Sequence, residues 1–368
     1  MAKQKSRSVV SEIAAGVGAE AKLKTDAEIA RLKADLLEYK GKYAFALKEI
    51  ERQKARADNK AAIRGVDPAK PVNIVSKAKK RTRKHSASAL LMLSDVHCEE
   101  RVRPETVNGA NDYSLDVCDQ RMQEVEERFL GSLDHERNLV DIDRVVVWLG
   151  GDFITGHIHE ELTEVCQLSP TNATRWVQAR IRRMLNRISP QAAEIVVITN
   201  AGNHGRDTPK QRIATELEHS YEQLMYHTMA EAEPCKNVHW KIAEGHLGYL
   251  DLDGFRIRHT HGHSIKYNGG VMGVALPAAK AIAAWDALDG PSDITIFGHY
   301  HSFSWLKGAR QISNGSVIGV SPYVKFIKAP PTSPCQGFAV IDHERNEVTR
   351  AYPIFCDRDL RRRAGAVS

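Results

Sequence analysis

The stretch Arg144-Val-Val-Val-Trp-Leu-Gly-Gly-Asp152 contains the pattern on which the fold of this chain depends. A short apolar run rich in β-formers ends at two glycines and then at a carboxylate. Valine and tryptophan favour a strand, and the glycines favour a turn directly after it. Trp148 lies inside the run, so we expect it to pack in the core rather than to stack on a ligand.

The same arrangement recurs four more times, and helical patterns lie between several of the runs. Strands that alternate with helices predict an α/β domain. Folds of this class place ligands outside the ends of the strands. The other apolar runs are 89–93, 195–199, 255–259 and 294–297, and the expected helices are 115–133, 174–188, 211–232 and 276–288.

The residues that follow these five runs are carboxylates, an amide and histidines. None of them is a cysteine, which argues against a structural zinc site. Mixed oxygen and imidazole donors suit manganese, iron, zinc, nickel or cobalt. Such donors at neighbouring strand ends predict a two-metal hydrolytic site, in which a carboxylate bridges two cations and a bound water becomes hydroxide near neutral pH. Each short motif is weak alone, and the order and placement of all five carry the prediction.

This ordered set resembles the calcineurin-like metallophosphoesterase superfamily, over roughly residues 88–302. Within this superfamily, the sequence most resembles the DNA-repair exonuclease branch and phage-type members. The resemblance implies a four-layer α/β sandwich, in which two mixed β-sheets are flanked by helices. The motifs are Asp95-Val-His97, Gly151-Asp152, Gly202-Asn203-His204, His261-Gly-His263 and Gly298-His299-Tyr-His301.

The resemblance also implies a role for each matching residue. Asp152 would bridge two divalent metal ions, manganese being the first choice and iron, zinc, nickel or cobalt the alternatives. His204 would be no ligand but the general acid that protonates the leaving oxygen. The first metal would be held by Asp95, His97 and His301, and the second by Asn203, His261 and His299.

Two positions depart from the family pattern or leave a choice open. An acidic residue commonly follows the His204 motif and orients the imidazole, but here Gly205 and Arg206 follow, so another carboxylate is needed for that support. The fork of Arg206 suits a phosphate oxygen, although a solvated loop charge is the alternative. His259 is the main rival of His261 as a ligand, because the two would share a face if the strand continued.

The loop after Asp152 and the cysteines offer weaker signals. His159 and Glu160 lie just beyond a bridging ligand, so we expect them to contact substrate, although such residues are more often plain surface groups. Six cysteines are scattered without a C-x-x-C pair, which is typical of reduced thiols in a cytosolic protein. Cys98, beside His97, is expected to be a small buried side chain.

Residues 1–64 form a basic helical arm in this interpretation. Apolar residues recur in alternating steps of three and four, which is the spacing of a coiled-coil seam. The seam lasts only about three heptads and contains Gly41, so self-association through it and a single helix packed on the body are both open. The seam residues are Ile29, Leu32, Leu36, Tyr39, Tyr43, Ala46 and Ile50.

The charge of the chain is concentrated before the domain. Residues 1–84 hold 22 Lys and Arg against 10 Asp and Glu, a net charge of +12, while the whole chain carries +6. Such asymmetry favours an anionic partner such as nucleic acid, although a solvated basic terminus is the plain alternative. We expect a basic linker at 65–86, the metallophosphoesterase domain at 87–356 and a basic tail at 357–368.

Features of the whole sequence limit the possible locations and functions further. The first residues are basic and polar, unlike a signal peptide, and no stretch reaches the roughly 18 apolar residues of a membrane span. We therefore expect a cytoplasmic protein of a bacterial or phage-infected cell. A DNA nuclease is the first hypothesis. A phosphatase or small-molecule phosphodiesterase is the second, and a non-catalytic nucleic-acid-binding or assembly protein is the third.

Overall fold

The computed structural model describes residues 84–269, 273–329 and 331–357, together with most positions between 25 and 54. It divides into two compact units, Met1–Lys80 and Arg81–Ser368. Every described position between 25 and 54 is helical, as expected for the arm. The expected linker up to residue 83 and the tail beyond residue 357 lie outside the described residues.

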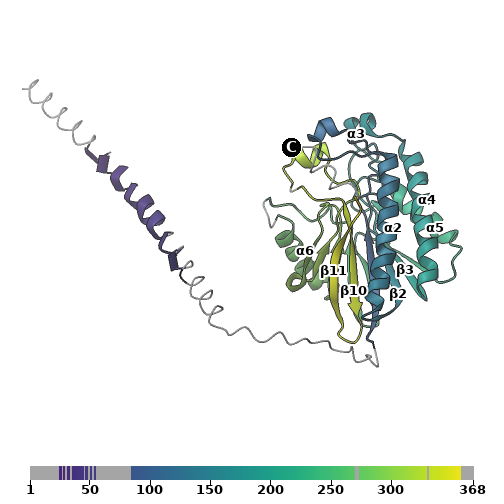
Figure 1. The fold of residues 1–368 in the computed structure, drawn as a ribbon. Coiled ribbons are helices and arrows are strands. Elements are labelled where there is room, and N and C mark those ends of the chain that lie inside the picture. Colours follow the sequence, from purple (N-terminus) through teal and green to yellow (C-terminus); the bar gives the residue numbers. More distant parts are fainter. Residues whose placement is uncertain are drawn as a thin grey trace, which may run out of the picture. The chain divides into compact units, whose positions relative to one another are not determined.

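The body contains two mixed β-sheets (Figure 1). In the first sheet the strand order is β11-β10-β1-β2-β3-β4, with β1 to β4 parallel and β10 and β11 antiparallel. These strands are β1 (Ser86–Leu93), β2 (Asp141–Leu149), β3 (Glu194–Thr199), β4 (Val238–Ile242), β10 (Cys335–Asp342) and β11 (Glu347–Phe355).

The second sheet has five strands in the order β5-β6-β7-β9-β8. Its central strands β6, β7 and β9 are parallel, and each edge strand is antiparallel to its neighbour. The strands are β5 (Gly248–Leu252), β6 (Phe255–Thr260), β7 (Ile294–Phe297), β8 (Ser304–Leu306) and β9 (Gln311–Ser313).

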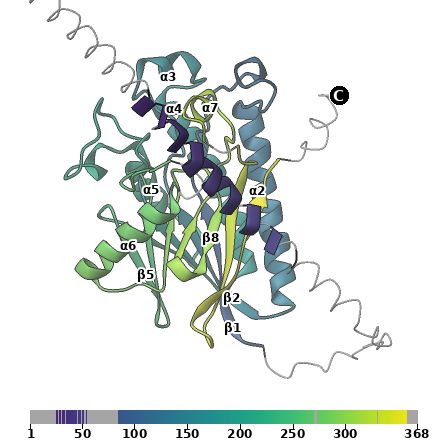
Figure 2. The same ribbon diagram turned by 90° about the vertical axis from the view of Figure 1, so that its left-hand side faces the viewer.

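Helices cover the outer face of each sheet. The helices α2, α4 and α5 pack on the first sheet, and α6 packs on the second (Figures 1 and 2). The four-layer α/β sandwich that the sequence predicted is confirmed. The helices are α2 (Leu115–Arg137), α3 (Glu160–Val165), α4 (Pro170–Ile188), α5 (Tyr221–Glu231), α6 (Ala275–Asp289) and α7 (Pro322–Phe326).

Strand β1 shows how the sequence builds the two cores. Because successive side chains of a strand point to opposite faces, Leu91 and Leu93 enter the core under the helices, while Leu90 and Met92 enter the core between the sheets. Trp148 of β2 is fully buried in this second core, as predicted. Both faces of the strand are apolar because both are covered.

One helix is shorter than its sequence pattern predicted. The pattern covered 211–232, but α5 begins only at Tyr221. Ser220 caps the helix, since its side chain accepts a hydrogen bond from the backbone N–H of Gln223. The preceding residues form a loop instead. Among the described residues, no helix is long and apolar enough to cross a membrane.

The register of the strands brings the polar loops together. Leu93, Leu149 and Thr199, each the last residue of its strand, are paired across the first sheet. Thr260 and Phe297 end two paired strands of the second sheet. Parallel strands end at the same edge of a sheet, so the residues that follow them become neighbours.

Candidate metal centre

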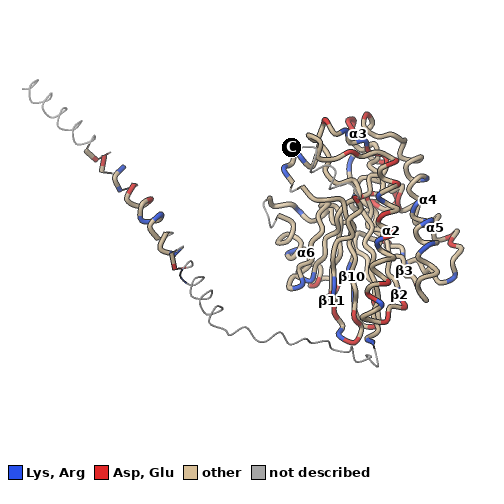
Figure 3. Tube along the Cα trace, viewed as in Figure 1, with Lys and Arg blue, Asp and Glu red and all other residues tan. Residues whose placement is uncertain are grey.

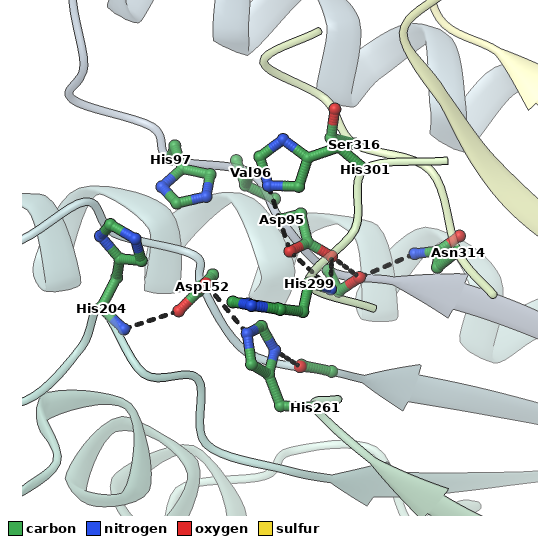
Figure 4. A network of polar contacts seen from close by, with 12 residues as sticks. Asp95, Val96, His97, Asp152, His204, His261, His299, His301, Asn314 and Ser316 are labelled. Carbon is green, nitrogen blue, oxygen red and sulfur yellow. Dashed lines mark hydrogen bonds and ion pairs between the residues drawn. The ribbon is translucent and has the colours of Figure 1, made fainter. Parts of the chain in front are cut away.

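The five loops at these strand ends meet in one cluster of carboxylates and imidazoles (Figure 4). Backbone hydrogen bonds hold the first two loops together, because the N–H of Asp95 donates to Gly151 O and the N–H groups of Val96 and His97 donate to Asp152 O. The site is therefore built on the sheets themselves, which makes it well suited to hold a fixed geometry.

The first group of candidate ligands is Asp95, His97 and His301. One donor atom from each lies within 4.8 Å of the other two. His301 Nε2 is 3.4 Å from Asp95 Oδ1, and the rings of His97 and His301 have centroids 5.2 Å apart. Asp95 is fully buried, a setting in which a carboxylate is usually paired or bound to a metal.

The second group is Asp152, His261 and His299, which meets the same 4.8 Å criterion. His261 Nε2 lies 2.9 Å from Asp152 Oδ2, and the rings of His261 and His299 have centroids 5.2 Å apart. Asp152 and His261 are each 1% exposed.

Several donor atoms of the two groups, and the amide oxygen of Asn203, are buried without a hydrogen-bond partner. They are His97 Nε2, Asn203 Oδ1, His261 Nε2 and His301 Nδ1. A buried polar atom without a partner costs roughly 1–3 kcal/mol, so four of them in one cluster need an explanation. All four are nitrogen or oxygen atoms of side chains that ligate divalent metals, and two cations would satisfy them. The residues therefore fit a metal pair.

Hydrogen bonds at the far nitrogen orient two of the rings. His261 Nδ1 donates to Gly150 O at 2.7 Å, and His97 Nδ1 contacts Thr155 Oγ1 at 3.1 Å. With the proton held on Nδ1, the lone pair of Nε2 points into the cluster. This arrangement is usual for metal-ligating histidines.

Protonation within the cluster agrees with this geometry. Burial lowers the pKa of His97 and of His299 well below the usual value, so both rings are neutral and able to ligate. For Asp152, burial opposes ionisation, but His261 and His204 hold its pKa well below the usual range. Burial also disfavours a charged His261, yet Asp152 raises the pKa of that ring to about 10. Without a metal the pair therefore traps a proton, which a cation would displace.

Five of the candidate ligands have left-handed backbone conformations, in which φ is positive. The angles are 53° for Asp95, 49° for His97, 52° for Asp152, 70° for His299 and 53° for His301. Such a conformation costs a non-glycine residue about 1–3 kcal/mol, and the strain tends to gather at functional sites. The turns that aim these side chains inward are thus kept at a cost to stability.

Two glycines leave room for the carboxylates. A Cβ on Gly202 would lie 2.1 Å from Asp152 Oδ1, and a Cβ on Gly298 would lie 2.5 Å from Asp95 Oδ2. Any side chain at either position would displace a candidate ligand. The Gly-Asn-His and Gly-His motifs of the sequence therefore have a steric reason for their glycines.

His204 lies beside both groups but belongs to neither. Its ring centroid is 4.8 Å from that of His97, and its backbone N–H donates to Asp152 Oδ1 at 2.8 Å. Its Nδ1 donates to Thr155 O at 2.9 Å. The support that a following acidic residue would give is thus supplied by a backbone carbonyl.

His259 and His261 lie in different settings in the structure. His261 is part of the second group, whereas His259 is buried and its Nδ1 bonds Asn200 Oδ1 at 2.7 Å. Burial lowers the pKa of His259 to about 3, so it is a neutral core residue. His263 stands next to the group, with its ring 5.5 Å from that of His261.

The three expected substrate contacts lie in different settings. His159 and Glu160 are exposed at the start of α3, and no hydrogen bond of their side chains ties them to the cluster. Arg206 donates to three carbonyls of its own loop, those of Asn203, Thr208 and Pro209. Their roles toward a substrate stay predictions.

Three supporting groups were not found from the sequence. Glu222 on α5 accepts from the backbone N–H groups of Gly202 and Phe153, at 2.7 and 2.6 Å. Burial, together with the charge of Asp152, raises the pKa of Glu222 to about 7. Glu99 accepts from the N–H groups of Thr155 and Gly156. No local pattern marks these residues, because their partners are distant backbone atoms.

The third supporting group is Asn314. It follows β9, and its amide donates to Ser94 Oγ and to Gln336 Oε1, both at 2.9 Å. Ser94 Oγ in turn donates to Asp95 Oδ2 at 2.5 Å. Asn314 thus holds the first carboxylate in place.

No family model and no curated protein matches this chain. Among solved structures it is similar to Vps29 of Chaetomium thermophilum, at 13% identity and a TM-score of 0.27, over 69% of this chain and 80% of that one. A protein described as a 5′-nucleotidase from Staphylococcus aureus, in complex with α-ketoglutarate, matches at 10% identity and a TM-score of 0.30. That match covers 76% of this chain, which spans 58% of the nucleotidase.

A third similar structure is AQ665 of Aquifex aeolicus, a protein of unknown function. It has 13% identity and a TM-score of 0.25, over 66% of this chain and 94% of that one. All three scores are low, so the function below rests on the side chains of this chain.

Proposed function

We propose that this chain is a metal-dependent phosphoesterase that hydrolyses phosphodiester bonds, with DNA as its substrate. The observation that carries the proposal is the pair of adjoining ligand groups, in which several donor atoms, among them His97 Nε2 and His301 Nδ1, are buried without a hydrogen-bond partner. Two divalent cations bound there would neutralise phosphate oxygens and lower the pKa of a water molecule toward neutrality. The order of the motifs, which resembles the metallophosphoesterase pattern, agrees with this chemistry.

The side chains have separate tasks in this proposal. Asp95, His97 and His301 hold one cation, Asn203, His261 and His299 hold the other, and Asp152 serves both. His204 protonates the leaving oxygen through Nε2, since its Nδ1 is engaged by Thr155 O. The fixed ring orientation removes the need for a neighbouring carboxylate.

DNA is favoured over a small ester by the distribution of charge. The basic excess lies in residues 1–84, whereas acidic and basic residues are interspersed over the body (Figure 3). An anionic polymer can contact both an active site and a separate basic segment of the chain, and a small phosphate ester cannot. Phosphate contacts made by Lys and Arg would give the binding a steep salt dependence.

We also propose that the helical arm binds the arm of a second copy of this chain. Its described seam residues are strongly exposed, with Leu32 at 62%, Leu36 at 55% and Tyr39 at 71%. Apolar residues at coiled-coil spacing gain stability when an identical helix covers them. A Leu36→Glu variant should therefore shift the chain to monomer in analytical ultracentrifugation, and an unchanged mass would remove this role.

The decisive assay is manganese-dependent turnover of duplex DNA, single-stranded DNA and aryl phosphate mono- and diesters. The Asp152→Asn protein is the blank, because asparagine tolerates the left-handed backbone at this position. Cleavage of DNA well above the blank is the expected result. Turnover of the small esters alone would replace the nuclease by a phosphatase or phosphodiesterase.

The role of the arm needs a separate measurement. A chain lacking residues 1–84 should bind DNA more weakly and with a flatter salt dependence, while its turnover of an aryl diester stays the same. An equal salt slope for the two chains would show that the arm does not bind phosphates.

A further inference from the structure

A third cluster of metal-ligating side chains stands beside the two groups described above. It consists of Glu216 before α5, His246 between β4 and β5, and His263 after β6. One donor atom from each lies within 4.8 Å of the other two. Three segments that are distant in the sequence therefore converge on one point.

The contacts in this cluster resemble those of the metal centre. Glu216 Oε1 lies 3.0 Å from His263 Nε2, yet this oxygen is buried and forms no hydrogen bond. Asp152 and His261 show the same relation, with 2.9 Å between the atoms and no hydrogen bond at His261 Nε2. In both cases a carboxylate oxygen and an imidazole nitrogen lie close together, as two ligands of one cation would.

The third member completes the set of donors. His246 Nε2 contacts Ser264 Oγ at 2.7 Å, and its Nδ1 faces Glu216 Oε2 at 3.7 Å. A hydroxyl at the far nitrogen is the kind of partner that orients a ligating histidine. The cluster thus repeats the arrangement seen for His97 and Thr155.

The side chains of the cluster are shielded from solvent. His263 is 7% and Glu216 13% exposed at the side chain, and His263 Nδ1 is buried without a hydrogen-bond partner. A cation bound by the carboxylate would balance a charge that is largely withdrawn from water.

We propose that Glu216, His246 and His263 form a third cation site, which takes a divalent transition metal such as Zn²⁺ or Mn²⁺. Two imidazoles and one carboxylate are a common ligand set for these ions, and they leave positions open for a further ligand. The proposal concerns binding alone and does not need the phosphoesterase activity.

The position of this site suggests that the third cation would help to bind a substrate. The His263 ring is 5.5 Å from that of His261 and 6.3 Å from that of His299, so the site adjoins the second ligand group. Glu216 also lines a small pocket together with Asn203 and Arg206. A cation there would add positive charge where the pocket meets the metal centre, and so bind an anionic oxygen of a substrate.

The test is metal stoichiometry, measured by equilibrium dialysis against Zn²⁺ or Mn²⁺ followed by mass spectrometry of the metal. The full chain should bind about three ions, and Glu216→Gln or His246→Ala should each remove about one. His219→Ala is the matched control, because His219 lines the same pocket but pairs with Asp207 at 2.9 Å. This control should keep the full number of ions.

Each outcome bears on the proposal. Loss of one ion in both cluster variants, but not in the control, supports the third site. Equal stoichiometry in Glu216→Gln, His246→Ala and the unchanged chain would overturn it. His246 is 31% exposed at its side chain and lies in a loop, so its replacement leaves the core intact, which a thermal melt checks. If the two ligand groups do not bind metal, the Asp152→Asn variant will bind as many ions as the unchanged chain, which is a separate result.

Discussion

Two sets of buried polar groups lie at the same edge of the sheets, and they differ in how their hydrogen bonds are satisfied. Around Asn314 every donor meets an acceptor, through Ser94, Gln336 and the N–H of Gly337. Directly beside this network, His97 Nε2 and His301 Nδ1 are buried without a hydrogen-bond partner. Both sets are equally buried.

The difference separates groups that hold the fold from groups that await a ligand. A satisfied network gains nothing from a cation and loses stability when one member is removed. A cluster with unsatisfied groups is stabilised most by a bound cation. Without a metal, replacing one of its charged members by a neutral residue can even raise the free energy of unfolding. Mutations among the satisfied groups should therefore lower stability and leave the metal content unchanged. Mutations among the unsatisfied groups should lower the metal content with little loss of stability.

The largest effect is expected for Asp152→Asn. In the proposed mechanism this one carboxylate serves both cations, so the variant should lose bound metal and lower turnover on the order of 10³-fold or more, since removal of a single stabilising donor already costs about 10²–10³-fold. The fold should persist, because asparagine retains the shape and accepts the N–H of His204. Metal analysis and a thermal melt on the same sample check this. Full metal content would refute the role of Asp152.

The next largest effect is expected for His204→Ala. Turnover should fall by about 10²–10⁴-fold, the usual contribution of a general acid. Metal content should stay the same, because His204 belongs to neither ligand group. His157→Ala is the control, as His157 is an exposed histidine near the same loop. Joint loss of metal and turnover would show that His204 is a ligand.

A third effect concerns a satisfied group outside the two ligand groups. Asp286 on α6 pairs with the fully buried Arg258 at 2.9 Å and with Arg310. Replacement by asparagine leaves Arg258 without its counter-charge, which should lower the free energy of unfolding by about 2–4 kcal/mol. Metal content and turnover should not change, and chemical denaturation measures the loss.

The pH dependence of this pair has a definite sign. Burial opposes ionisation of Asp286, but Arg310 and Arg258 lower its pKa below the usual 3.8. The ionised form is therefore favoured in the folded state, so its contribution is full above the unfolded pKa and disappears as the pH falls through the lower folded value. The difference between wild type and Asp286→Asn should be constant near neutrality and shrink in acid. A difference that grows in acid would contradict this assignment.

The central strands and the ligand motifs that follow them could be predicted from the sequence, because both are short local patterns. The five runs that end at Asp95, Asp152, Asn203, His261 and His299 could be read along the chain, and so could the layers that the resemblance implied. The start of α5 could not, since the cap at Ser220 competes with a continuous helical pattern. Glu222 could not be found either, because its partners are backbone N–H groups about 20 and 70 positions away in the chain.

Arg206 is the position where sequence and structure suggest different tasks, and the expected effect there is the smallest. Its fork suits a phosphate, but in the structure Nε, Nη1 and Nη2 each donate to a carbonyl between Asn203 and Pro209. Arg206→Lys keeps the charge and loses this planar geometry. A loop-holding role predicts a loss of roughly 1–2 kcal/mol in stability and a KM within about threefold of wild type. A phosphate-binding role predicts an unchanged melting temperature and a KM raised about tenfold. Because Asn203 is itself a candidate ligand, a loose loop should also weaken metal binding, and only the loop-holding role predicts that third change.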